Sequence, residues 1–391
     1  MNAYIIGGYR TAVGKAPKGS LRFVRPDDMA AAVIRRLLDD FPQIDKKTID
    51  DVIVGNAFPE AEQGFNMGRM LSLLALDTVE VPGSTINRYC ASGLESIAIA
   101  AAKIHSGMAD IVLAGGAETM SLVSMGGWRV TPNPDIALKH PKWYLNMGLT
   151  SEMVAKEYAI TREAQDQFAL SSMQKAVKAI DEGVFNSQIV PLQVTETYVK
   201  DDRPTSRNYT FSIDEGPRRD TSAEALAKLK PAFSADGSST AGNSSQMSDG
   251  AAFVLVVSEK VLRQYNLSPI ARFVGYQVAG VEPYKMGIGP VAAIPKVLRH
   301  TGLRLDDIDL IELNEAFASQ SLAVIGELGL NPDRVNINGG AIALGHPLGA
   351  TGTKLSVQLL YDMRRLRKRY GMVTMCVGSG QGAAGIFENL S

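Results

Sequence analysis

Two stretches of this 391-residue chain read Ile49-Asp-Asp-Val-Ile-Val-Gly-Asn-Ala-Phe58 and Ile308-Asp-Leu-Ile-Glu-Leu-Asn-Glu-Ala-Phe317, 259 residues apart. Each follows an apolar-periodic stretch typical of a helix, at 29–38 in the first case and at 292–300 in the second. Similarity at a fixed offset indicates an internal repeat. The chain is therefore predicted to contain two related halves, and the alternation of strands with helices in each half predicts α/β layers.

A second match pairs a cysteine with a histidine. Cys90-Ala-Ser-Gly93 aligns with His346-Pro-Leu-Gly349 at an offset of 256 residues, and each is followed by a helix-length run and a strand rich in small residues. A pseudo-twofold arrangement of the halves would bring these helix starts together, so we expect Cys90 and His346 to lie side by side. Chance similarity between amphipathic helices is the alternative, but it would have to produce both matches.

Composition narrows the class of protein. A chain of this length with 45% apolar residues can bury more than one core, which predicts two or three domains. The 40 basic and 41 acidic side chains nearly balance, so the overall charge favours neither nucleic acid nor an anionic membrane. Two cysteines in unlike motifs indicate a reducing compartment, with the cytoplasm as the expected location. With no secretory signal and no apolar run long enough to span a bilayer, a soluble protein is expected.

The pattern of apolar residues changes in the middle of the chain. Near-continuous apolar runs at 111–114, 253–257 and 372–377 predict strands buried on both faces. Between 120 and 245 the chain instead carries both tryptophans, several Pro and Gly residues and a helical stretch at 161–183. We therefore predict an N-terminal half at 1–119 plus 246–268, an inserted loop domain at 120–245 and a C-terminal half at 269–391.

Cys90 has the setting of a reactive thiol. It precedes a helix-forming run, so its sulfur should lie at a helix N-terminus, where unpaired N–H groups favour an anion. Such a position lowers a thiol pKa. The resulting thiolate would be a competent acyl acceptor, especially beside an imidazole that takes its proton. The alternative is an inert buried cysteine.

His346 lies in the glycine-rich stretch 339–352. Pro347 suits the first turn of a helix, and the glycines at 345, 349 and 352 allow close approach of backbones. A histidine in this position can act as the base for Cys90 or can donate to a thioester oxygen. The alternative is a histidine that bonds only within its own turn.

Cys376 ends a predicted strand and opens the segment Cys376-Val-Gly-Ser-Gly-Gln-Gly382. Its thiol and the N–H of Gly378 could therefore reach one ligand, as an acid and base at a carbon centre would. Glycine strings of this kind also occur in dinucleotide sites. That fingerprint, however, needs a following helix and an acidic residue ~20 positions on, and the sequence ends at Ser391.

Four segments together resemble the signature of the thiolase family. They are an Asn-x-x-Cys-x-Ser-Gly segment, an Asn-Glu-Ala-Phe segment, a Gly-His-Pro-x-Gly-x-x-Gly segment and a Cys-x-Gly-x-Gly-x-Gly segment, found in the family order at Cys90, Asn314, His346 and Cys376. The resemblance runs almost from end to end. It implies a thiolase-like α/β fold, in which two related halves form a layered αβαβα core and an inserted loop domain covers the active site and holds coenzyme A.

The resemblance also implies roles for individual residues. Cys90 accepts the acyl group, His346 serves as its base, and Cys376 moves the proton at C2 of the acetyl unit. The N–H groups of Gly378 and Cys90 form one oxyanion site. Asn314 holds a water that forms the other with the histidine, although an asparagine here could instead cap a turn. Implied contacts to coenzyme A or the acyl chain are Ser245, Phe233, Arg218, Met147, Met286 and Phe317; an ordinary loop or core methionines are the alternatives.

The reaction implied by the resemblance is reversible, coenzyme A-dependent thiolytic cleavage of a 3-ketoacyl-CoA through an acyl-cysteine, as in fatty acid β-oxidation. Coenzyme A would be a substrate, with no permanently bound cofactor and no metal. Acyl-CoA molecules and further copies of the chain, in a homodimer or homotetramer, are the expected partners, and a hydratase-dehydrogenase subunit could join them. Neither nucleic acid nor a membrane is expected to bind.

Other functions remain open from the sequence. Asn146 stands before Met147-Gly148, where biosynthetic members usually have His, so the degradative subtype is favoured over a biosynthetic acetoacetyl-CoA thiolase. A ketoacyl synthase is another alternative, and Cys376 argues against it. A non-catalytic thiolase-like carrier is the third, and the presence of all four motifs argues against it.

Overall fold

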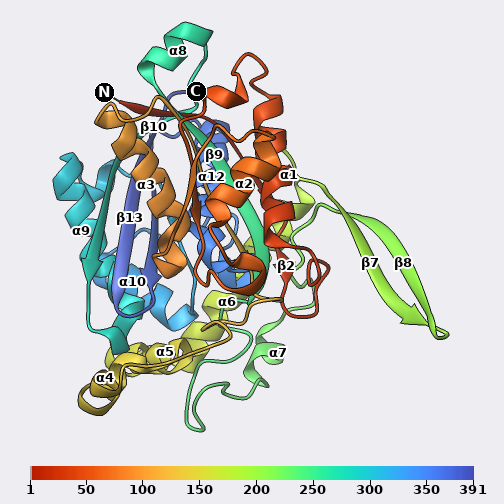
Figure 1. Cartoon of the computed structure of the whole chain (residues 1–391). Coiled ribbons are helices and arrows are strands. Elements are labelled where there is room, and N and C mark those ends of the chain that lie inside the picture. The colour runs from red at the N-terminus through yellow and green to blue at the C-terminus, as the bar shows by residue number, and fades with distance from the viewer. Residues whose placement is uncertain (1) are drawn as a thin grey trace.

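The computed structural model describes residues 2–391 and contains one large mixed sheet covered by helices (Figure 1). The strands are β1 (Ala3–Thr11), β2 (Gly14–Lys15), β3 (Asp51–Gly55), β4 (Gly83–Ile86), β5 (Ile111–Thr119), β6 (Ile189–Val190), β7 (Leu192–Lys200), β8 (Arg203–Phe211), β9 (Ser248–Ser258), β10 (Ala271–Gly280), β11 (Leu310–Leu313), β12 (Tyr370–Val377) and β13 (Gln381–Asn389). The helices are α1 (Pro26–Asp39), α2 (Met67–Leu76), α3 (Ser92–His105), α4 (Pro134–Lys139), α5 (Met147–Glu157), α6 (Arg162–Asp181), α7 (Ala223–Ala227), α8 (Glu259–Tyr265), α9 (Gly289–Thr301), α10 (Ala318–Leu328), α11 (Ala341–Leu344) and α12 (Leu348–Leu366).

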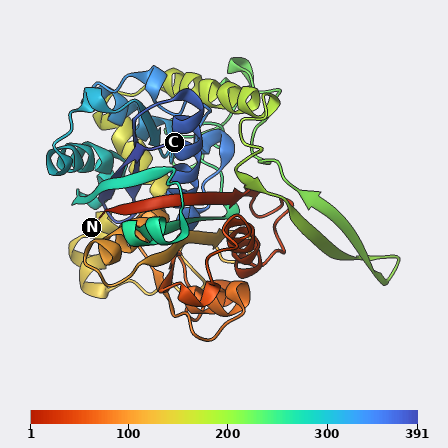
Figure 2. The same cartoon turned by 90° about the horizontal axis from the view of Figure 1, so that it is seen from above.

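The order of the strands repeats in the two halves of the sheet. It reads β4-β3-β5-β9-β1 in one half and continues β10-β13-β12-β11 in the other. The halves join where β1 and β10 pair antiparallel at Tyr4–Arg272 and Ile5–Ala271. Figure 2 shows the two halves on either side of this junction. The predicted repeat at 49–58 and 308–317 therefore covers β3 and β11, which occupy equivalent places in the two halves.

Alternating side chains sort the fold into five layers. On β3, Val52 and Val54 pack in a core with α1 and α2, whereas Ile53 packs in a second core with α3 and α12. On β12, Val373 also faces this second core, but Met372 joins a third core with α9 and α10. Helices α3 and α12 therefore lie between the two half-sheets, and the predicted αβαβα layering is confirmed.

The segment between β5 and β9 forms the surroundings of the predicted site. Helix α6 confirms the helix expected at 161–183: Thr161 caps its N-terminus by accepting from the N–H of Ala164, and Gly183 follows it with φ +68°. The hairpin β7–β8, which was not expected from the sequence, projects away from the molecule (Figures 1 and 2). Within residues 2–391, no helix is both long and apolar enough to cross a membrane.

The two outer edges of the sheet are finished differently. Strand β4 closes one edge, and in the equivalent place beside β11 the chain makes only the single bridge Ile311–Val335. Asn336 completes that edge with its side chain. Its Oδ1 accepts from the N–H of Leu313 at 2.9 Å, and its Nδ2 donates to the carbonyl of Leu313 at 2.8 Å.

Candidate active site

Cys90 lies in a 3₁₀ turn (Tyr89–Ala91) that leads directly into α3. The turn is tight, because Tyr89 adopts φ +43°, a left-handed conformation that is costly for a bulky residue. This conformation turns the chain sharply just before the cysteine. The sulfur packs against Ala57, Met120 and Leu348, so residues from both halves surround it. The predicted position at a helix start is confirmed.

His346 precedes Pro347, the N-cap of α12, so its position is equivalent to that of Cys90 in the other half. Its Nδ1 lies 2.6 Å from Oγ1 of Thr351, and that hydroxyl donates to the carbonyl of Pro347 at 2.9 Å. Because the hydroxyl proton is already used, Oγ1 must accept from Nδ1–H. This leaves a lone pair on Nε2, the state that a general base requires.

Close backbone contact brings these two helix starts together. A Cβ at Gly93 would lie 2.7 Å from Thr353 and 2.9 Å from the carbonyl of Gly349. A Cβ at Gly352 would lie only 2.2 Å from the N of Leu94. Side chains would force α3 and α12 apart at these positions. The prediction that the glycines at 349 and 352 serve close backbone approach is confirmed.

Burial decides the charge states of the pair. It raises the pKa of Cys90 to about 12, although the N–H groups of Gly378 and of Cys90 itself favour the thiolate and oppose the rise. The expectation that the helix start lowers this pKa is therefore wrong, because loss of water outweighs the helix terminus. Burial also lowers the pKa of His346 to about 3. The resting pair is thus a neutral thiol beside a neutral imidazole.

Cys376 is the penultimate residue of β12 and is fully buried. Its pKa is raised, first by burial and then by the neighbouring Cys90. Two residues later comes Gly378, whose N–H favours the thiolate form of Cys90 and so lowers the pKa of that thiol. Both cysteines are free thiols. Two thiols and one backbone donor therefore lie close together.

Asn314 follows β11 and is fully buried. Its Nδ2 lies 3.3 Å from Nε2 of His346, which agrees with a lone pair on that nitrogen. It does not cap a helix, because α10 begins only at Ala318 and has Phe317 as its N-cap. Asn314 and His346 thus form a pair beside the start of α12, and that helix start meets the start of α3, where Cys90 lies.

Two family models match the chain, the thiolase N-terminal domain at residues 3–260 and the thiolase C-terminal domain at 267–389. The chain belongs to the thiolase family. It is 52% identical to a 3-ketoacyl-CoA thiolase of Bacillus subtilis (strain 168), with 99% of each chain covered. It is 42% identical to an acetyl-CoA acetyltransferase of Escherichia coli (strain K12), covering each chain completely. The crystal structure of a Bacillus anthracis acetyl-CoA acetyltransferase superposes with a TM-score of 0.89 at 39% identity, covering 100% of this chain and 99% of the other.

Most of the predicted substrate contacts of this thiolase gather beside Cys376. Met286 and Phe317 share a small apolar cluster with it, and the partly buried Met147 packs against that cluster. The ring of Phe233 stands edge-on to that of Phe317 at 5.9 Å between centroids. Ser245 is adjacent, since its N–H donates to the carbonyl of Ala316.

Arg218 lies apart from this cluster. Its N–H bonds to the sulfur of Met173 on α6, and it lines a surface pocket with Lys178 and Arg219. Burial, and then the charge of Arg218, lowers the pKa of Lys15, so a second cation lies nearby. The same pocket holds Asp181 and Glu182, which pair with Arg219 and Lys178, so its surface carries charges of both signs.

Sequence reasoning missed Glu118, at the end of β5 in the thiolase core. Its buried carboxylate accepts from the N–H groups of Ala57 and Gly349 at 2.8 and 2.7 Å and from the Gln63 amide at 2.8 Å. Burial raises its pKa to about 7. Glu118 thus ties the start of α12 to the loop that contacts Cys90. No motif marked it, because an acid after a buried strand is ordinary in sequence.

Across residues 2–391, no group of three or more His, Cys, Asp or Glu side chains is placed to hold a metal.

Proposed function

We propose that this thiolase is a degradative 3-ketoacyl-CoA thiolase, with Cys90 as nucleophile, His346 as its base and Cys376 as the acid and base at C2. Cys90 gives its proton to Nε2 of His346 and attacks the 3-keto carbon. The C2–C3 bond breaks, C2 takes the proton of Cys376, and acetyl-CoA leaves. Incoming coenzyme A gives its proton to the Cys376 thiolate and takes the acyl group from Cys90, which regains its proton from His346.

The observation that carries this proposal is that Cys90, near Cys376 and Gly378, and His346, bonded to Asn314, lie at helix starts that meet between the halves. The neutral imidazole suits the first step, because a charged His346 could not accept the thiol proton. Negative charge develops on oxygen in both half-reactions, so two sets of donors are required. We assign the N–H groups of Gly378 and Cys90 to one set, and Asn314 with His346 to the other.

Coenzyme A is proposed to reach this point along the segment between β5 and β9. Phe233 and Ser245 would contact the pantetheine arm, Met147, Met286 and Phe317 would line the acyl pocket, and Arg218 would meet the nucleotide phosphates. The support is their placement: the apolar residues cluster at Cys376, and Arg218 lies near a second cation, Lys15. No permanently bound cofactor is needed for this chemistry.

A biosynthetic acetyl-CoA acetyltransferase is the second candidate, because relatives at 42% and 39% identity carry that name. Asn146 favours the degradative reading. It caps α5, with Oδ1 accepting from the N–H of Leu149 at 2.9 Å, so the position before Met147 has a structural role here. The name and higher identity of the Bacillus subtilis relative point the same way.

We further propose that the protein is a homo-oligomer in the cytoplasm, where two reduced thiols would persist. Strand β4 and the helix α2 packed on it lie at the sheet edge. Large apolar side chains are exposed on and around α2. They are Phe65, Met70, Leu73, Leu74 and Val79. Such a patch is typical of a protein interface. Sedimentation of the wild type against Leu73→Glu would test the assignment, with a shift to monomer expected for the variant.

The decisive experiment is coenzyme A-dependent cleavage of 3-ketoacyl-CoA molecules from four carbons to long chains, with wild type and Cys90→Ser compared. Activity that rises with chain length and vanishes in the variant supports the degradative assignment. Activity confined to acetoacetyl-CoA would support the biosynthetic one. Inactivity on the whole series would contradict both.

A further inference from the structure

The segment that carries Phe233 and Ser245 contains little regular structure. After the short helix α7 it runs as turns and irregular chain to β9. A long irregular segment has many conformations unless specific contacts restrict it. Phe233 is 39% exposed, so burial alone does not hold its ring against Phe317. Other contacts must position this loop, defined here as residues 226–245.

One residue of α6 holds the beginning of the loop. Nη2 of Arg162 donates to the carbonyls of Leu226 and Leu229, both at 2.8 Å. These carbonyls lie at and just beyond the end of α7, where helix acceptors lack intrahelical partners. Nε of the same guanidinium donates to Asp166 at 2.8 Å, one turn further along α6.

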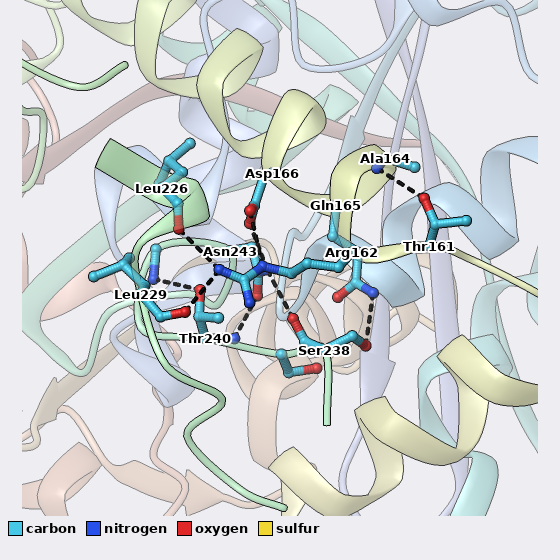
Figure 3. Close-up of polar contacts among 12 residues, drawn as sticks. Thr161, Arg162, Ala164, Gln165, Asp166, Leu226, Leu229, Ser238, Thr240 and Asn243 are labelled. Carbon is cyan, nitrogen blue, oxygen red and sulfur yellow. Dashed lines mark hydrogen bonds and ion pairs between the residues drawn. The ribbon is translucent and has the colours of Figure 1, made fainter. Parts of the chain in front are cut away.

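Asp166 holds the end of the loop. Its Oδ1 accepts from Nδ2 of Asn243 at 2.9 Å, and Asn243 in turn bonds the carbonyl of Ser238 and the N–H of Thr240. Figure 3 shows Arg162, Asp166 and Asn243 in a row between α6 and the two arms of the loop. Asn243 is fully buried and Asp166 nearly so. A single ion pair therefore connects both arms of the loop to one helix turn.

The anchored end continues directly into the predicted substrate contacts. The carbonyl of Asn243 accepts from the N–H of Ala318, and two residues on, Ser245 bonds Ala316. Ser244 bridges Phe317, the residue whose ring meets Phe233. The position of Asn243 thus sets where the loop meets the acyl pocket.

We propose that Arg162, Asp166 and Asn243 are positioning residues that fix the coenzyme A-binding loop by joining its two arms to α6. This assignment rests on the proposed function. None of the three side chains is assigned to the reacting atoms. We expect their effect through coenzyme A binding, because misplacing a group that positions the substrate by about 1 Å can lower the reaction rate by up to about 100-fold. The chemistry at Cys90 is left intact.

The test compares the wild type with two variants. Asp166→Asn keeps the shape of the side chain but removes its charge, and Arg162→Lys keeps the charge but removes the guanidinium group that donates several hydrogen bonds at once. Coenzyme A affinity by calorimetry should fall at least about tenfold in both, and KM for coenzyme A should rise while kcat changes little. N-acetylcysteamine, a short acceptor thiol that does not span the loop, should be acylated at the wild-type rate. Trypsin should cut faster after Lys228, which lies between the two carbonyls that Arg162 holds.

Glu259→Gln is the matched control, because it removes an Arg263–Glu259 pair of the same i,i+4 spacing on the remote helix α8. It should change none of these readouts. If activity with coenzyme A and with N-acetylcysteamine falls equally in Asp166→Asn and Arg162→Lys, the damage is general and the assignment is overturned. Unchanged affinity for coenzyme A in these variants would also overturn it. Should Asp166→Asn fail to fold, Arg162→Lys carries the test. If the wild type binds coenzyme A but does not cleave 3-ketoacyl-CoA, the proposed reaction is refuted. The binding and proteolysis measurements would then still decide whether Arg162, Asp166 and Asn243 position the loop. A wild type without coenzyme A binding would refute both.

Discussion

The two halves of the molecule place a helix start at the same point of the sheet, but they equip it differently. In the N-terminal half the turn before α3 carries Cys90, whose pKa burial raises. In the C-terminal half the turn before α12 carries His346, whose pKa burial lowers. The same loss of water thus keeps both groups neutral. The comparison teaches that a repeated scaffold supplies the geometry, while the residue at one equivalent position in each half supplies the chemistry.

The largest expected effect comes from removing the nucleophile of the N-terminal half. Cys90→Ser should lower kcat for thiolysis on the order of 10⁴-fold or more, because a serine hydroxyl in this buried setting is a far poorer acyl acceptor. Steady-state cleavage and mass spectrometry for the acyl-enzyme are the measurements. Activity within tenfold of the wild type would refute the assignment of Cys90.

The next largest effect distinguishes the roles of the two cysteines. Cys376→Ser should slow carbon–carbon cleavage by roughly 10²–10⁴-fold, the usual contribution of a general acid or base. Acylation of Cys90 by a saturated acyl-CoA should remain detectable in this variant, because there Cys376 only returns a proton to the departing coenzyme A thiolate, a far weaker base than the carbanion at C2. Mass spectrometry of the intact protein reports it. If both partial reactions fall equally in both cysteine variants, the division of roles is wrong.

Changing a glycine between the halves tests the geometry itself. A Cβ at Gly349 would lie 2.6 Å from Cα of Asn56, so Gly349→Ala should destabilise the protein by up to about 3 kcal/mol in urea unfolding. Gly326→Ala in α10 is the control, since its Cβ would meet nothing within 4 Å. It should stabilise by up to about 1 kcal/mol. Equal effects in the two variants would show that close approach at α12 is not required.

The dependence of stability on pH should have opposite signs in the two halves. The folded pKa of His346 is about 3 against an ordinary 6.5, so its contribution is present above pH 6.5 and is lost as the pH falls towards 3. The folded pKa of Glu118 is about 7 against 4.5, so its contribution is present below pH 4.5 and is lost as the pH rises through 7. Each effect amounts to about 2 kcal/mol between pH 7 and pH 5.

Urea unfolding at pH 7 and pH 5 measures these slopes. His346→Gln should lose less stability on acidification than the wild type, because it lacks the group whose burial resists protonation. Glu118→Gln should lose more, because it lacks the group whose burial favours protonation. Parallel slopes in the two variants would contradict the assigned shifts.

Much of the core could be predicted from the sequence, because its signals are local. The repeat predicted the positions of β3 and β11, and the glycines at 349 and 352 predicted a close backbone contact, which α3 and α12 make. Asn314, His346 and the cysteines were recognisable from motifs. The raised pKa of Cys90 could not be predicted in this way. A helix start can be recognised from neighbouring residues, whereas the burial of the thiol depends on how both halves pack around it.

The residues missed by the sequence act over long separations. Glu118 bonds Gly349, and Asp166 bonds Asn243. No short pattern connects such partners, and buried acids of this kind resemble exposed ones in sequence. The hairpin β7–β8 was missed because only its base is buried, so its alternation fades along the strands.

The two edges of the sheet limit how copies of the chain can join. At β11 the side chain of Asn336 occupies both backbone groups of Leu313, so another strand cannot pair there without displacing it. At the other edge, Nδ2 of Asn66 donates to the carbonyl of Gly83 on β4 at 2.8 Å. Side chains of the molecule itself therefore occupy backbone groups at both ends of the sheet. A sheet finished in this way resists growing from copy to copy into a fibre.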